Sequence, residues 1–121
     1  MASQGKGSGR LRRIEAQMQR VLAELIPREV KDPRVGPVTV TQVALAPDLS
    51  TARVFIVPFG DAGGRPDVLA GLKAAAGFLR GEVGRAVGLR HAPRLDFVRD
   101  DSFDRAAELS ALISAANKPR D

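Results

Sequence analysis

Residues 68–83 constrain the fold more than any other stretch of this chain. Their apolar side chains recur at spacings of three and four, which is typical of a helix with one buried face; they are Val68, Leu72, Ala75, Ala76, Leu79 and Val83. The helical pattern runs from about residue 67 to 87, but Gly77 lies in its middle. Because a glycine inside a helix costs on the order of 1 kcal/mol relative to alanine, we expect a break there. A second helix would then start at a new angle, with outward-facing backbone N–H groups that attract phosphate.

The segments before this helix show first a helical and then a strand periodicity of apolar residues. An amphipathic helix is predicted from residue 10, with its end limited by Pro27 and Pro33. Residues 37–46 and 52–59 read as strands, and the turn at 47–50 makes them an antiparallel hairpin. The apolar residues of the first strand change phase between Val40 and Val43, which predicts a β-bulge near Thr41 or Gln42.

The remainder of the chain predicts a third strand at 94–99 and a last helix. Ser102 is a good N-cap for that helix, which carries Ala106, Leu109 and Ile113. The order α-β-β-α-kink-α-β with an added C-terminal helix predicts an α+β fold, with a three-stranded sheet covered by helices on one face. We expect a flexible tail over residues 1–9, one domain over 10–116 and a C-terminal tail over 117–121.

The charge of the chain points to a polyanionic partner. The net charge is +5, and 15 of the 19 basic residues are arginine, whose guanidinium group binds phosphate with two hydrogen bonds. Nucleic acid is favoured over a membrane, although a generally basic protein remains an alternative. The chain has no tryptophan, no tyrosine and five phenylalanines, so it has few aromatic side chains on which RNA bases could stack. The absence of cysteine and of a long apolar run predicts a cytoplasmic protein.

The sequence offers little for catalysis, metal binding or a cofactor. It lacks a P-loop, a dinucleotide fingerprint and an HExxH motif. His91 is the only histidine, and its spacing from Asp100 and Ser102 supports neither a nucleophile elbow nor an oxyanion hole; a structural or RNA-facing histidine is favoured. The acidic residues 100, 101 and 104 suit a helix N-terminus better than a metal site. We therefore expect no enzyme activity, no metal and no cofactor.

Basic residues near the expected helix break are the candidates for RNA binding. They are Lys73, Arg80, Arg85 and Arg90, which flank a turn that has no other stabilising reason to carry glycine. Arg80 is the strongest candidate, and the alternative for the set is a solvated helix face. Lys31 and Arg34 are added because the sequence gives no structural reason for them, whereas Asp32 and Pro33 suit a helix exit. The basic cluster of Arg10, Arg12 and Arg13 could add phosphate contacts. Asp48 and Ser50 are interpreted as turn residues.

The order of the elements is that of a KH domain of the second type, although the GxxG loop that binds nucleic-acid backbone in such domains is absent. Over residues 10–113 the chain resembles the bacterial ribosome-binding factor A family. The resemblance rests on KDPRV (31–35), VTVTQV (38–43), DLSTARV (48–54), AAGFLR (75–80), LRHAP (89–93) and the spaced group Phe97, Asp100 and Ser102. It implies a KH-like fold in which an Ala-x-Gly kink, here Ala75, Ala76 and Gly77, replaces the GxxG loop.

The resemblance also implies a function. Proteins of this family help to assemble the small ribosomal subunit. The expected partners are therefore 16S-type precursor rRNA and the free 30S subunit, bound by a monomer without catalysis. The family is further associated with maturation of the rRNA 5′ end and with growth in the cold. The alternative is a general KH-like RNA-binding module with no ribosomal role, and a small hydrolase is a distant third.

Overall fold

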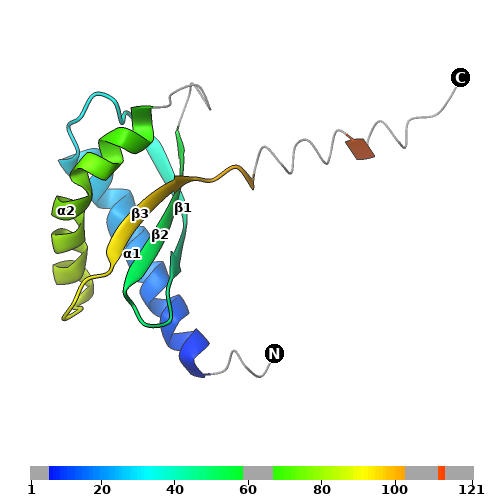
Figure 1. The fold of residues 1–121 in the computed structure, drawn as a ribbon, viewed down its shortest axis with the longest axis vertical. Helices are drawn as coiled ribbons and strands as arrows, with labels where there is room; N and C mark the ends of the chain where they lie inside the picture. Colours follow the sequence, from blue (N-terminus) through cyan, green and yellow to red (C-terminus); the bar gives the residue numbers. More distant parts are fainter. Residues whose placement is uncertain (1–5, 59–66, 103–111, 114–121) are drawn as a thin grey trace, which may run out of the picture.

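The sheet has three strands in the order β1-β2-β3 (Figure 1). The structure is a computed structural model that describes residues 6–58, 67–102 and 112–113. Strand β1 (Val38–Leu45) pairs antiparallel with β2 (Thr51–Pro58), and β2 pairs parallel with β3 (Arg94–Arg99). The predicted hairpin and third strand are confirmed. The register shifts between Val40 and Gln42, so the predicted bulge is also confirmed and lies at Thr41.

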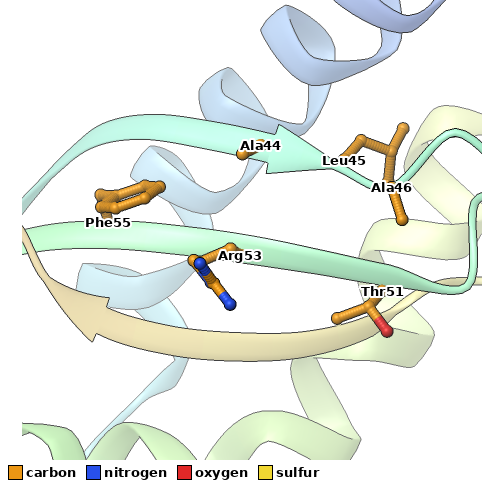
Figure 2. Close-up of a pocket in the computed structure, with 6 residues that line it drawn as sticks. All are labelled: Ala44, Leu45, Ala46, Thr51, Arg53 and Phe55. Carbon is orange, nitrogen blue, oxygen red and sulfur yellow. The ribbon is translucent and has the colours of Figure 1, made fainter.

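Two helices cover one face of this sheet, and the α+β class is therefore confirmed. Helix α1 (Lys6–Glu29) packs against β1, α2 (Asp67–Val87) packs against β3, and the helices pack against each other. Alternation along β2 decides which face is covered: Ala52, Val54 and Ile56 are fully buried, whereas Arg53 is exposed and Phe55 is half-buried. Figure 2 shows Arg53 and Phe55 on the face turned away from the helices.

Helix α1 forms because one of its faces is apolar at helical spacing. Ile14, Met18, Leu22 and Leu25 are buried against the sheet. The helix begins at Lys6, before the expected start at residue 10, and it continues through Pro27 to Glu29. Pro27 has no N–H to donate to the carbonyl four residues earlier, and the helix ends two residues after it. The helix thus ends between Pro27 and Pro33, as predicted.

Polar side chains of α1 hold the outer edge of β1 at two points. The Gln19 side-chain amide donates to the carbonyl oxygens of Val40 and Thr41, at 3.1 and 3.3 Å, where the bulge interrupts the ladder. The Glu15 carboxylate accepts a 2.8 Å hydrogen bond from the backbone N–H of Leu45. These bonds satisfy backbone groups at an edge strand, where no neighbouring strand can do so.

Helix α2 is continuous, and the predicted division into two helices at Gly77 is wrong. All residues from Asp67 to Val87 are helical, and Gly77 has no positive φ. A Cβ atom at Gly77 would meet nothing within 4 Å, so no close packing requires a glycine there. Burial of Leu72, Leu79 and Val83 on one face outweighs the local propensity of glycine. The N–H groups expected at an internal helix start are bonded within the helix. Figure 1 nevertheless shows the helix changing direction along its length.

The predicted C-terminal helix falls mostly outside the described residues. At its expected start, the carboxylate of Asp100 accepts a 2.9 Å hydrogen bond from the backbone N–H of Ser102. In the part of the chain that the structure covers, neither helix is long and apolar enough to cross a membrane.

Candidate nucleic-acid interface

The solvent-facing side of α2 carries small residues along its centre. We call the exposed residues Lys73, Ala74, Gly77, Phe78, Arg80, Gly81 and Arg85 the outer face of α2. Gly77 and Gly81 are open, since a Cβ atom would meet nothing at the first and only the Arg85 side chain, at 4.0 Å, at the second. The backbone of the helix is therefore accessible to a partner along this side.

Larger side chains border this open strip on both sides. With 3.6 residues per turn, Lys73 and Arg80 lie on one border, and Phe78 and Arg85 lie on the other. Figure 1 shows α2 on the outside of the domain, away from the open sheet face. The outer face thus joins accessible backbone with cations on either side, a combination that suits an RNA backbone.

A basic groove adjoins the C-terminal half of α2, and we define it by its ten lining residues. Its volume is about 570 Å³. Three arginines of the predicted set line it, one each from α1, α2 and the connection to β3. The lining residues are Arg10, Asp48, Leu49, Ser50, Arg80, Gly88, Leu89, Arg90, His91 and Ala92.

Two glycines at the end of α2 bring the walls of the basic groove together. Gly88 follows the last helical residue with φ of +78°, and the N–H groups of Gly88 and Leu89 both donate to the carbonyl of Gly84. This is the left-handed helix ending that glycine favours. A Cβ atom at Gly84 would lie 3.0 Å from the Cβ of Ala92, so a glycine there lets the connection fold back onto the helix. Arg90 is thereby placed in the same groove as Arg80.

Hydrogen bonds hold the Arg80 side chain and the turn at Asp48 and Ser50, which both line the groove. The Nε of Arg80 donates to the carbonyl oxygen of Ala92 at 2.9 Å, which orients the guanidinium group. Asp48 accepts hydrogen bonds from the hydroxyl and the backbone N–H of Ser50, and these lower the pKa of Asp48. The interpretation of Asp48 and Ser50 as turn residues is confirmed. Between them Leu49 has φ of 62°, an uncommon value for a residue with a side chain.

In the loop after α1, Lys31 is exposed, whereas Arg34 forms an ion pair within the loop. The guanidinium group of Arg34 binds both carboxylate oxygens of Asp32, with its closest contact at 2.7 Å, and the Arg34 N–H binds the same carboxylate. Hydrogen bonds from the Arg34 side chain, and then from its backbone, lower the pKa of Asp32 to about 2. The expectation that Arg34 has no structural role is therefore wrong, because Asp32 neutralises its charge. Lys31 has no ion pair among the described residues.

The remaining predicted residues lie apart from the basic groove. Lys73 is on the outer face of α2, and Arg12 and Arg13 are exposed on α1 beside Arg10. Arg85 forms an ion pair with Glu82, one turn earlier on α2. The structure therefore gathers Arg10, Arg80 and Arg90 into one groove and distributes the other predicted cations around it.

Phe78 belongs to this surface but is absent from the predicted set. Its side chain is 51% exposed, although phenylalanine is usually buried. The spacing contains the signal, because Phe78 is four residues from Ala74 and three from Gly81 and so shares their exposed side. A second hollow lies on the open sheet face, where Ala44, Arg53 and Phe55 line it (Figure 2). There Arg53 lies 3.8 Å from the carboxylate of Asp96.

Together, the helix-covered sheet and the arginine-lined groove define a small basic α+β domain of the nucleic-acid-binding class. A family model described as Ribosome-binding factor A matches residues 10–113. The chain belongs to the ribosome-binding factor A family.

Similar proteins agree with this assignment. Ribosome-binding factor A of Pseudomonas entomophila is 51% identical over 92% of this chain and 86% of its own length. The Lachnoclostridium phytofermentans protein of the same name is 45% identical over 93% of this chain and 83% of its own length.

Solved structures of the family share the fold. The crystal structure of ribosome-binding factor A from Thermus thermophilus is 34% identical and covers 74% of this chain and 94% of its own, with a TM-score of 0.65. A homology model of the Thermus thermophilus protein, fitted into a cryo-EM map of a 30S–RbfA complex, gives a TM-score of 0.63 at 34% identity and covers 74% of this chain and 93% of its own.

Proposed function

We propose that this chain binds the free 30S subunit and its 16S-type precursor rRNA, and that it promotes late assembly of the subunit and maturation of the rRNA 5′ end. It acts as a monomer in the cytoplasm, by binding rather than by catalysis, and it matters most for growth in the cold. The observation that carries the proposal is the convergence of Arg10, Arg80 and Arg90 in one groove. The 30S complex of a family member with the same fold supports the choice of partner.

The charges of the groove are available to phosphate. Arg10 and Arg90 have no ion pair among the described residues, and Arg80 uses its Nε on a neutral carbonyl group. Guanidinium groups keep their charge at all physiological pH values and bind phosphate oxygens in pairs. Among the described residues, Asp48 is the one carboxylate in the groove lining, and it accepts hydrogen bonds from Ser50. The groove therefore offers a net positive wall to RNA.

The open strip of α2 explains how the RNA backbone comes close. Gly77 and Gly81 have no steric need of glycine within the domain, so their small size serves the approach of a partner. Phosphates bordering that strip would meet Lys73 on one side and Arg85 on the other. Such contacts read the shape and charge of RNA more than its sequence.

Binding promotes assembly only if it discriminates between states of the subunit. A ligand shifts a conformational equilibrium by its difference in affinity for the two states. The chain therefore holds a 30S conformation in which its rRNA site is open, and it dissociates when mature contacts close that site. Misfolded RNA helices rearrange more slowly at low temperature, which accounts for a stronger requirement in the cold.

Sedimentation of a cell lysate tests the proposal. We expect the chain in the fractions of free 30S subunits and little of it in joined ribosomes or large subunits. A deletion strain should accumulate precursor 16S-type rRNA, most of all in the cold. Equal occupancy of free and joined subunits, together with normal rRNA processing in the deletion strain, would leave only a general RNA-binding module. Turnover of RNA or nucleotide by the purified protein would contradict the absence of catalysis.

A further inference from the structure

The exposed side chain of Phe78 is not explained by the packing of the domain. The core around the sheet is complete without it: Leu72, Leu79 and Val83 of the same helix are fully buried. Of the other phenylalanines within the described residues, Phe97 is buried and Phe55 is half-buried on the sheet. Phe78 therefore keeps an apolar ring in water on the outer face of α2, where a binding partner gains by covering it.

The ring forms one wall of a hollow of about 260 Å³ between α2 and the loop after α1. Gly71, Ala74 and Ala75 of α2 also line it, as do Glu29 at the end of α1 and residues 30–32 of the loop after it. The hollow is open to solvent.

The charges at this hollow favour RNA as its occupant. Lys31 lines it, and Arg85 lies seven residues beyond Phe78 on the same side of α2, about 10 Å along the helix. The two carboxylates of the hollow are already paired, Glu29 with Arg28 at 3.0 Å and Asp32 with Arg34 at 2.7 Å. Arg85 contacts Glu82 through Nη2, and its side chain stays 72% exposed. Basic groups therefore lie on each side of an exposed aromatic ring, which is the arrangement by which single-stranded nucleic acid is bound through its bases and its phosphates together.

We propose that Phe78 stacks on an unpaired RNA base, while Lys31 and Arg85 hold phosphates on either side of that nucleotide. This inference rests on the proposed function and deepens it. The groove of Arg10, Arg80 and Arg90 binds backbone, and the hollow at Phe78 selects a segment in which a base is free to leave its helix. Paired RNA offers no such base, so the chain distinguishes an unpaired strand from a duplex at this position.

The absence of tryptophan and tyrosine allows a direct test. The substitution Phe78→Trp introduces one indole, whose fluorescence is quenched when a base stacks on it. We expect quenching by a short single-stranded RNA of mixed sequence and by 16S-type rRNA, and none by a short RNA duplex. The matched control is Phe55→Trp on the open sheet face (Figure 2), which should stay unquenched. No quenching at position 78, or equal quenching at both positions, would overturn the inference.

Affinity gives the second measurement. Phe78→Ala should weaken binding to single-stranded RNA and co-sedimentation with free 30S subunits roughly five- to 150-fold, the range expected when one stacked base is lost. Phe78→Leu keeps an apolar side chain without a stacking surface and should weaken binding almost as much. Because Phe78 is exposed, thermal melts should show both variants folded. Wild-type affinity in Phe78→Ala would exclude stacking.

The two proposals fail in different ways. If the wild-type chain binds neither rRNA nor 30S subunits, the proposed function is wrong and the inference at Phe78 falls with it. If the wild-type chain binds 30S subunits and Phe78→Ala binds them equally well, only the stacking inference is wrong. If Phe78→Ala weakens binding to RNA duplex and to single-stranded RNA by the same factor, Phe78 does not recognise an unpaired base.

Discussion

Gly71 of α2 lies so close to Val35 that a Cβ atom at position 71 would stand 2.7 Å from Cγ2 of that valine. Val35 belongs to the core, with 3% of its surface exposed, and it cannot move away without opening a gap. The same Cβ atom would lie 3.4 Å from Arg34 and from Asp32. Gly71 therefore sets the distance between α2 and the loop that carries Lys31.

The substitution Gly71→Ala should destabilise the domain. Alanine favours the helix by about 1 kcal/mol, but overpacking against Val35 costs about 1–3 kcal/mol. We expect the net free energy of unfolding to fall, as measured by urea denaturation. The double variant with Val35→Ala makes room for the new methyl group and should show a smaller effect of the alanine at 71. An unchanged or raised stability in Gly71→Ala would mean that the loop adjusts without cost.

The opposite outcome is expected for Gly77→Ala. Space around Gly77 is open and its backbone is helical, so alanine should stabilise the domain by up to about 1 kcal/mol, visible as a higher melting temperature. If the glycine serves the approach of RNA, the same variant should bind free 30S subunits less tightly. Higher stability with unchanged binding would remove Gly77 from the interface. Lower stability would contradict the continuous helix.

Charge reversal at Arg80 should weaken RNA binding without unfolding the domain. Each phosphate contact contributes about 0.7–0.9 to the slope of log affinity against log salt, so Arg80→Glu should make the slope shallower by roughly 1. The control is Arg53→Glu, which changes the net charge equally but lies on the open sheet face. Filter binding to 16S-type rRNA over a salt series measures both. Equal losses in the two variants would indicate a non-specific charge effect.

The Asp32–Arg34 pair should give a characteristic acid titration. The folded-state pKa of Asp32 is about 2, below the ordinary value of 3.8, so the pair stabilises the fold above the unfolded pKa. That stabilisation is lost as the pH falls from about 3.8 through about 2. NMR titration of the Asp32 carboxyl carbon should show the lowered midpoint, and Arg34→Met should move it back toward the ordinary value. A normal midpoint in the wild-type chain would contradict the ion pair.

Local periodicity was sufficient for much of the fold. The spacing of apolar residues predicts the strand at 94–99, the bounds of the helical segment at 67–87 and a bulge near Thr41 or Gln42, and each is present, whereas the predicted break at Gly77 is wrong. Such patterns are readable because a residue's side of a helix or strand depends only on its position along that element. The family followed from the order of short motifs, since their spacing is also a property of the linear chain.

Only the tertiary structure decided how distant segments meet. Gly77 carries a local penalty that is visible in the sequence, but burial of one whole face of α2 keeps the helix continuous through it. The sequence likewise could not place Arg10, Arg80 and Arg90 in one groove or leave Phe78 at the surface, because those positions depend on how helices, turns and strands pack. Spacing along one element determines which residues share a side, whereas contacts between elements are set by the packing energy of the whole domain.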